Sequence, residues 1–242
     1  MVELLSLRDV SKSFGAIVVA DRLNFSVSQG EAVGILGPNG AGKTTLMGLI
    51  TGTLAPDAGQ IRFEGQDISG LPTHQRCRRG IARAFQVPQP FGDMTVFENL
   101  VVAATFGAQN SAREAQRRCL EILAQCGLTA RANEAAGQLT LLNRKRLELA
   151  RALATRPKLL LLDEVAGGLT EHECHDLIEL IRQVHRSGVT VVWIEHVVHA
   201  LLAAVGRVVV LYQGQLVADG DPHEVVKSPL VAEIYMGIGT SD

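Results

Sequence analysis

The sequence predicts an α/β fold in which a mostly parallel β-sheet is flanked by helices. Three apolar runs, at 158–162 (KLLLL), 189–194 (VTVVWI) and 208–211, have the length and composition of buried strands. Between the first two runs, apolar residues recur on one helical face, formed by Cys174, Leu177, Ile178, Ile181 and Val184. Strands that alternate with helices imply parallel pairing, so these runs predict the centre of the sheet.

The remaining segments divide the chain into a core and an insertion. The first third has β-like patches separated by turns such as Gln29-Gly30, which predict an N-terminal antiparallel β subdomain. Residues 111–125 have helical spacing instead, with Gly127 as a stop signal. We therefore predict a single domain, with a core of residues 1–86 and 157–242 and an inserted helical subdomain at about 87–156.

Charge and hydropathy favour neither nucleic-acid binding nor a membrane span. The 23 Lys and Arg residues nearly balance the 25 Asp and Glu residues, and no block of five basic residues occurs. The nearest approach to one, Arg76, Arg78, Arg79 and Arg83, is interpreted as a solvated helix face. No apolar run reaches the roughly 18 residues that are needed to cross a bilayer.

Cysteine usage and the N-terminus indicate the cytosol. Cys77, Cys119, Cys126 and Cys174 include no C-x-x-C pair, which suits reduced thiols. The first fifteen residues alternate like a strand and lack a charged leader followed by an apolar run. No secretion is therefore expected.

The segment GPNGAGKTT matches the phosphate-binding pattern G-x-x-x-x-G-K-[ST]. Its glycines let backbone N–H groups approach a phosphate, Lys43 adds a positive charge, and Thr44 offers a hydroxyl to Mg²⁺. A strand at 31–36 and a helix at 44–51 flank the loop, so the helix N-terminus faces the phosphate. We predict a P-loop NTPase core that binds a nucleotide through Gly37, Pro38, Asn39, Gly40, Ala41, Gly42, Lys43, Thr44 and Thr45.

Two carboxylates follow the leucine run. Asp163 and Glu164 lie at the C-terminal end of a predicted strand, the edge at which open α/β sheets bind ligands. Asp163 is expected to hold Mg²⁺, directly or through a water, and Glu164 to polarise the water that attacks a γ-phosphoryl group. An Asp-Glu pair alone could be a helix cap beside a surface carboxylate. The preceding apolar strand and the phosphate loop favour the functional interpretation.

Over nearly its whole length, the chain resembles the ATP-binding subunits of ABC transporters. The segments GPNGAGKTT, ARAFQ with its Gln86, LELARAL, LLLLDE and WIEH with its His196 occur in that family's order. The resemblance implies ATP and Mg²⁺ as ligands and ATP hydrolysis as the activity.

The resemblance also assigns roles to three residues outside the phosphate loop. Phe14 matches the aromatic residue that stacks on adenine, and stacking of a base contributes roughly 1–3 kcal/mol elsewhere. Gln86 matches the residue that reaches Mg²⁺ and the attacking water, and His196 the histidine that hydrogen-bonds the γ-phosphate. The expected catalytic residues are Glu164, His196 and Gln86, and the expected Mg²⁺ ligands are Thr44, Gln86 and Asp163.

The main departure from the family lies in its signature, LSGGQ, which here reads LTLLN. The signature of one family member closes over the ATP held by its partner, so Leu139, Thr140, Leu141, Leu142 and Asn143 are expected to act in trans. Thr140 can replace the serine, and Asn143 can cap the following helix. Leu142 replaces a glycine and costs of order 1–2 kcal/mol if its φ is positive. We therefore expect Mg-ATP binding with weak hydrolysis by the isolated subunit.

Within the family, GIARAFQ, PFGDMTVFENL and VAEIYMG resemble the ATPases of branched-chain amino acid importers. This implies a homo- or heterodimer of ATPase subunits, two membrane-spanning permease subunits and, indirectly, a periplasmic solute-binding protein. It implies a cytoplasmic subunit, peripheral on the inner face of the cell membrane. Phe91, Met94 and Phe97 are expected to line the groove for a permease helix, or to pack the helical insertion.

Three other functions stay open on the sequence. A lipopolysaccharide-export ATPase has a similar length, although its segment around the coupling glutamine differs. A nucleotide-gated dimerising module with weak hydrolysis would suit the segment LTLLN. A soluble repair or translation ATPase usually carries a coiled-coil insertion or a second ATPase domain, and neither is visible in the sequence.

Overall fold

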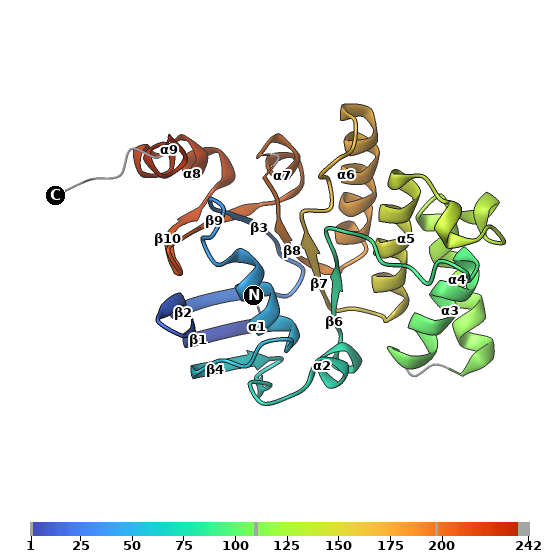
Figure 1. The fold of residues 1–242 in the computed structure, drawn as a ribbon, viewed down its shortest axis with the longest axis horizontal. Coiled ribbons are helices and arrows are strands. Elements are labelled where there is room, and N and C mark those ends of the chain that lie inside the picture. The colour runs from blue at the N-terminus through green and yellow to red at the C-terminus, as the bar shows by residue number, and fades with distance from the viewer. Residues whose placement is uncertain (1, 109–110, 197, 237–242) are drawn as a thin grey trace.

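Two β-sheets organise the computed structural model, which describes residues 2–108, 111–196 and 198–236 (Figure 1). The smaller, antiparallel sheet has the order β2 (Ile17–Ser28), β1 (Glu3–Phe14), β4 (Ala58–Phe63) and β5 (Gln66–Asp67). The larger sheet has the order β10 (Gln215–Gly220), β9 (Arg207–Tyr212), β3 (Ala32–Leu36), β8 (Thr190–Ile194), β7 (Leu159–Asp163) and β6 (Ile81–Ala84). From β9 to β6 its strands are parallel, and β10 is antiparallel at the edge. The predicted α/β class, with a mostly parallel sheet and an N-terminal antiparallel sheet, is confirmed.

The helices are α1 (Lys43–Thr51), α2 (Thr73–Arg79), α3 (Val96–Phe106), α4 (Ala112–Gln125), α5 (Leu141–Ala154), α6 (Glu171–Arg186), α7 (Val198–Ala204), α8 (Pro222–Lys227) and α9 (Pro229–Met236). Between β6 and β7 in the chain, α3, α4 and α5 pack on one another, at the right of Figure 1. No helix of the described residues is long and apolar enough to cross a membrane.

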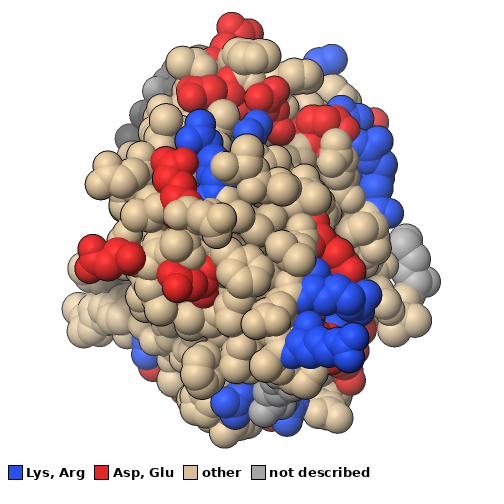
Figure 2. Space-filling model, turned by 90° about the vertical axis from the view of Figure 1, so that its right-hand side faces the viewer, with Lys and Arg blue, Asp and Glu red and all other residues tan. Residues whose placement is uncertain are grey.

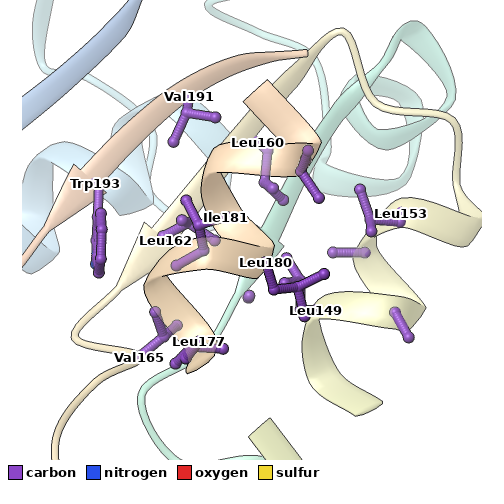
Figure 3. Packing of buried hydrophobic residues seen from close by; sticks show 14 of the residues in the cluster. Leu149, Leu153, Leu160, Leu162, Val165, Leu177, Leu180, Ile181, Val191 and Trp193 are labelled. Atoms are coloured by element: carbon purple, nitrogen blue, oxygen red, sulfur yellow. The ribbon is translucent and has the colours of Figure 1, made fainter. Parts of the chain in front are cut away.

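Alternate side chains of the larger sheet enter two different hydrophobic clusters, so the sheet is buried on both faces. Leu160 and Leu162 of β7 belong to the cluster that contains α5 and α6, and Figure 3 shows them beside Ile181 of α6. Leu159 and Leu161 belong to the cluster that contains α1 and the smaller sheet. This burial on both faces explains why the strands are continuous apolar runs.

Thr170 and Glu173 form a capping box at the start of α6, as the sequence Thr170-Glu171-His172-Glu173 predicts. The Thr170 hydroxyl accepts from the Glu173 N–H at 3.3 Å, and the Glu173 carboxylate accepts from the Thr170 N–H at 2.9 Å. The helix then buries the predicted apolar face against the sheet.

Arg76 contradicts the interpretation of the basic cluster as a solvated face. Its side chain is buried, and its Nη1 donates to the carbonyls of Leu49 at 2.6 Å and Ile50 at 3.0 Å. These carbonyls belong to the last turn of α1, where helix carbonyls lack intrahelical partners and the helix dipole favours a cation. Its remaining nitrogens donate to the carbonyls of Leu71 and Ser69. A long-range cap of this kind has no local sequence signal.

Figure 2 shows the side of the molecule that carries α3 and α4. Positively and negatively charged side chains lie close together on this surface. Ion pairs at this end include Arg117 with Glu121, and Arg131 with Glu134. Exposed ion pairs of this kind contribute little to stability. The buried cap made by Arg76 is therefore the better contact for a test of stability.

Replacing Arg76 by methionine is expected to destabilise the protein by roughly 2–3 kcal/mol, because buried carbonyls lose a charged donor. Urea unfolding followed by circular dichroism measures the change. The matched control is Arg78→Met, which alters an exposed arginine of the same helix and should change stability by less than about 0.5 kcal/mol. Equal effects of the two substitutions would contradict the capping role.

Candidate nucleotide-binding site

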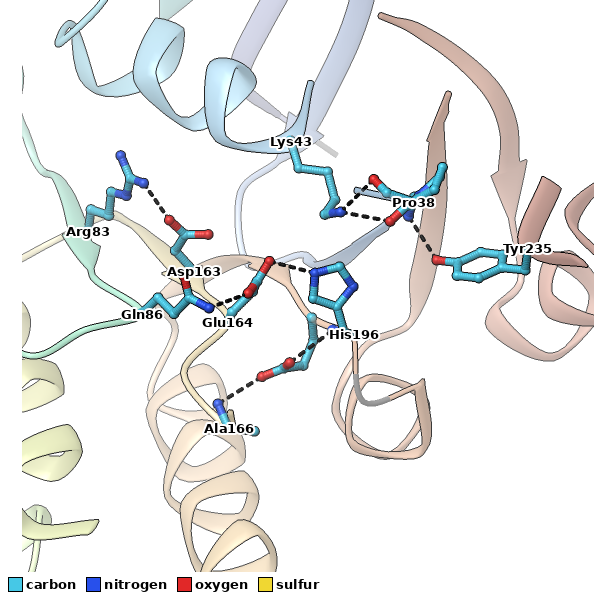
Figure 4. A network of polar contacts seen from close by, with 11 residues as sticks. Pro38, Lys43, Arg83, Gln86, Asp163, Glu164, Ala166, His196 and Tyr235 are labelled. Atoms are coloured by element: carbon cyan, nitrogen blue, oxygen red, sulfur yellow. Dashed lines mark hydrogen bonds and ion pairs between the residues drawn. The ribbon is translucent and has the colours of Figure 1, made fainter. Parts of the chain in front are cut away.

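Three adjacent parallel strands deliver the predicted site residues to one edge of the larger sheet. In the order β3, β8, β7, each strand ends at this edge. The phosphate loop follows β3, His196 follows β8, and Glu164 follows β7. Residues more than a hundred positions apart in the chain therefore meet in space, as Figure 4 shows.

Two glycines of the phosphate loop are required by the protein's own packing. A Cβ on Gly37 would lie 2.2 Å from the carbonyl oxygen of Leu211, and one on Gly42 would lie 2.5 Å from that of Val19. Gly42 is also left-handed, with a φ of 103°, and directly precedes α1. The glycines thus let β9 and β2 press against the loop, in addition to leaving its N–H groups accessible.

Lys43 is buried, and its ammonium is held by the phosphate loop. Its Nζ donates to the carbonyls of Gly37 at 2.7 Å and Pro38 at 3.0 Å (Figure 4). Burial lowers the pKa of Lys43, while the charges of Glu164 and Asp163 raise it. The ammonium is therefore placed between the loop and the two carboxylates.

Tyr235 of α9 reaches the first residue of the loop. Its hydroxyl oxygen accepts a hydrogen bond of 2.9 Å from the Gly37 N–H (Figure 4). Burial raises the pKa of this phenol. The last described helix thus anchors the start of the phosphate loop.

Asp163 ends β7 as a buried carboxylate and makes an ion pair with Arg83 of β6. Arg83 also lies over the ring of Phe85, 4.7 Å from its centroid. The interpretation of Arg83 as a solvated residue is therefore wrong. Arg83 reaches the carboxylate of Asp163 because β6 and β7 are adjacent parallel strands. The sequence alone does not show that these two strands are neighbours.

Both oxygens of the Glu164 carboxylate are engaged. Gln86 Nε2 donates to Glu164 Oε2 at 2.6 Å, and His196 Nε2 lies 2.7 Å from Glu164 Oε1 (Figure 4). A carboxylate only accepts, so in this contact Nε2 carries the proton. Glu164 itself has a φ of 48°, unusual for a side chain, and its N–H donates to the Ile194 carbonyl at 2.9 Å. This backbone turns the chain off the sheet and points the carboxylate at Gln86 and His196.

The donor set is chemically suited to Mg²⁺. Asp163 and Thr44, the exposed residue in the first turn of α1, supply oxygen ligands, which Mg²⁺ prefers together with water and phosphate oxygens. The amide oxygen of Gln86 is a further oxygen of the same kind. These three residues remain predicted ligands.

Phe14 ends β1 with an exposed ring, 48% accessible. The Lys12 ammonium lies 5.7 Å from the ring centroid. Phe14 pairs with Ile17 in the hairpin of β1 and β2. The backbone carbonyl of Val19, in the same hairpin, lies beside Gly42. The hairpin therefore brings an accessible aromatic ring toward the phosphate loop, where stacking on a base stays a prediction.

The segment LTLLN begins a regular helix, and the residue expected to cap it was wrong. The cap is Thr140, whose hydroxyl accepts from the Asn143 N–H at 3.5 Å, whereas Asn143 itself lies inside α5 and is buried. Leu142 is helical and is not among the residues with positive φ, so the anticipated backbone strain is absent. Leu141 is exposed and lies against Gly168.

The residues proposed for a permease groove divide into two kinds. Phe91 and Met94 are exposed, and Arg151 lies 5.4 Å from the Phe91 ring centroid. Phe97 instead packs against the hydrophobic core. The first two can serve a docking surface, and the third serves the packing of the helical insertion.

Taken together, the loop, the buried lysine and the two carboxylates at the ends of parallel strands define a P-loop nucleotide-binding protein. A family model, ABC transporter, matches residues 20–167 of the chain. The branched-chain amino acid transport ATP-binding protein BraF of Pseudomonas aeruginosa is 36% identical, over 97% of this chain and 98% of that protein. The lipopolysaccharide export ATP-binding protein LptB of Acidithiobacillus ferridurans is 35% identical, over 98% of each.

Solved structures agree with these relatives. The ADP conformation of an ATP-binding cassette from an ABC transporter superposes with a TM-score of 0.88 and 31% identity, over 98% of this chain and 100% of that chain. A dimeric cassette bound to ADP and Pi superposes with a TM-score of 0.81 and 25% identity, over 90% of this chain and 99% of that chain. The chain belongs to the ABC transporter family, as one of its ATPase subunits.

Sequence reasoning missed Arg83, Glu195 and Tyr235 as parts of this site. Glu195 directly follows an apolar strand, just as Asp163 ends one. This similarity could have predicted that Glu195 lies at the same edge of the sheet. Tyr235 lies in a short C-terminal helix with no local feature that relates it to residue 37.

Phe14→Ala is expected to weaken ATP binding about tenfold or more, because stacking of a base contributes roughly 1–3 kcal/mol. Inorganic triphosphate has no base, so its affinity should not change. Titration calorimetry with both ligands checks this, and Phe14→Trp is the control that retains a ring. Equal losses for ATP and triphosphate would mean that Phe14 does not contact the base.

Proposed function

We propose that this ATPase subunit binds Mg-ATP, pairs with a second ATPase subunit and powers an importer for branched-chain or other hydrophobic amino acids or related amides. The observation that carries the catalytic part is the placement of Glu164 between Gln86 and His196, beside Lys43 of the phosphate loop. Similarity to BraF over nearly the full length supports the choice of solute.

The phosphate loop binds the nucleotide. Its N–H groups at the start of α1 face the phosphates, and Lys43 moves its hydrogen bonds from loop carbonyls to phosphate oxygens. Thr44, Asp163 and Gln86 would hold Mg²⁺, which would neutralise charge that develops on the phosphoryl group. Phe14 stacks on the adenine.

Glu164 acts as the base for the attacking water. Its carboxylate has about four acceptor positions, and the contacts with Gln86 and His196 use two of them. A water on the γ-phosphate side can therefore donate to the same carboxylate. His196 and Gln86 orient Glu164. With ATP bound, His196 would contact the γ-phosphate and Gln86 the metal, so the geometry of the site would depend on whether the γ-phosphate is present.

The second half of each site comes from the partner ATPase subunit, in a homo- or heterodimer. Thr140 presents its hydroxyl at the N-terminus of α5, where a phosphate of the partner's ATP would meet helix N–H groups. The dimeric structure of a related cassette supports this arrangement. Leu141 is exposed and Leu142 half-buried beside it, while buried Leu139 and Asn143 support this signature surface from within.

Two membrane permease subunits dock beside the helical insertion. A hollow of about 210 Å³ is lined by residues of α1, α2, β6, α3 and α5 and by Phe85, which directly precedes Gln86; Arg83, Glu148 and Arg151 are among the lining residues. Exposed Phe91 and Met94 extend this apolar region. The subunit thus works on the cytoplasmic face of the membrane, and the periplasmic solute-binding protein acts on it through the permeases.

The lipopolysaccharide-export function is the second candidate, because LptB is nearly as similar as BraF. We rank it lower because the segments around Gln86 and the C-terminal VAEIYMG resemble those of amino acid importers.

Glu164→Gln is the decisive variant for the ATPase site. It should retain ATP affinity within about threefold, reduce turnover at least a hundredfold and trap an ATP-bound dimer, because an amide binds like a carboxylate but accepts no proton. Vesicles that contain the subunit with the permeases of its own operon measure the coupled process. Wild-type vesicles should take up leucine when the binding protein is present, and the variant should not.

Normal hydrolysis by Glu164→Gln would refute the assignment of the base. Solute uptake that proceeds in the variant would refute the coupling, and release of lipopolysaccharide instead of leucine uptake would favour the second candidate.

The segment LTLLN bears on how fast ATP turns over. Leu142 places a side chain where the family has glycine, at a helix N-terminus that approaches phosphate. We expect slow hydrolysis by the isolated subunit and a severalfold faster rate for Leu142→Gly, measured as phosphate release. The control is Leu120→Gly, an exposed leucine within α4, which carries the same helix penalty of about 1 kcal/mol far from the signature. A rate typical of the family that does not respond to Leu142→Gly would argue against this.

A further inference from the structure

Two ionisable side chains are almost completely buried close to the site without belonging to the groups that meet ATP or Mg²⁺. Glu195, at the end of β8, is 1% exposed, and Lys145 of α5 is 4% exposed. Burial of a charge is costly unless an opposite charge and hydrogen bonds compensate it. The contacts of both residues therefore need an explanation.

Glu195 holds the two loops on either side of the catalytic glutamate. Its Oε1 accepts a hydrogen bond of 2.8 Å from the Ala166 N–H, and its Oε2 accepts one of 2.9 Å from the His196 N–H. Figure 4 shows both contacts at Ala166 and His196. Ala166 lies two residues beyond Glu164, so one carboxylate fixes the loop of the base and the loop of the histidine.

Lys145 connects this arrangement to the segment around Gln86. Its Nζ donates to the Gln86 carbonyl at 3.2 Å. Burial lowers the pKa of Lys145, and the negative charge of Glu195 raises it. Lys145 lies in the second turn of α5, the helix that begins with the signature segment LTLLN.

We propose that Lys145 and Glu195 are a pair of buried positioning residues that set the placement of Gln86, Glu164 and His196. Both residues act through backbone groups: Glu195 through the Ala166 and His196 amides, and Lys145 through the Gln86 carbonyl. Movement of the signature helix would reach the segment around Gln86 through Lys145, which lies on that helix. This inference rests on the roles assigned above to Gln86, Glu164 and His196.

The activity test compares Glu195→Gln, Lys145→Met and the double variant. Each single change should lower kcat at least tenfold and leave the KM for ATP within about threefold, because the phosphate loop and Lys43 are untouched. The double variant should lose less than the product of the two single losses, because both residues hold the same network of Gln86, Glu164 and His196. Lys145→Arg should retain most of the activity because its guanidinium can still donate to the Gln86 carbonyl.

Arg146→Met is the matched control. Arg146 is the next residue of α5, is also partly buried and pairs with Asp176 of α6 at 3.1 Å, outside the network. Its kcat should stay within twofold of the wild-type value. A kcat of Glu195→Gln equal to wild type, parallel changes in kcat and KM, or independent losses in the double variant would each overturn the proposal.

A second measurement does not depend on ATPase activity. Amide hydrogen exchange followed by NMR should be at least tenfold faster at Ala166 and His196 in Glu195→Gln than in Arg146→Met, while amides of β7 stay protected. Unchanged exchange at these two amides would overturn the positioning role. If the wild-type protein hydrolysed no ATP yet showed this exchange pattern, the catalytic assignment would fail and the positioning pair would stand.

Discussion

Parallel pairing of β3, β8 and β7 is the constraint on which the site depends. Because parallel strands end at the same edge, the phosphate loop, His196 and Glu164 converge without any long insertion to carry them there. The pairing is stable because alternate side chains of each strand enter the two hydrophobic clusters on opposite faces of the sheet. The packing that stabilises the sheet thus also sets the geometry of the site.

Much of this could be predicted from sequence, for identifiable reasons. The phosphate loop, the strand before Asp163 and the capping box at Thr170 are local patterns in which chemistry fixes residue types at fixed spacing. The surroundings of Arg76 and Arg83 were misjudged because both bind groups that only the tertiary fold brings near. At Asn143, the pattern allowed two capping residues three positions apart, and the helix begins after the earlier one.

Buried polar groups in this protein mostly bind backbone atoms. Arg76 caps a helix, Glu195 accepts two backbone N–H groups, and Lys43 donates to loop carbonyls. Such contacts fix loops that have no regular hydrogen bonding of their own, and an unsatisfied partner would be costly. The site loops are therefore held by side chains from the rigid core, while the Glu164 carboxylate keeps acceptor positions for a water.

The strand order has a consequence for co-translational folding. β3 and the phosphate loop are complete by residue 45, yet the two strands that flank β3 span residues 190–194 and 207–212, and the Gly37 N–H finds its partner at Tyr235. A nascent chain therefore carries an apolar strand with both edges unpaired during most of its synthesis, the kind of segment that chaperones shield. The nucleotide loop therefore takes its final shape only after residues 190–235 have emerged and folded onto it, so nucleotide affinity is gained late in synthesis.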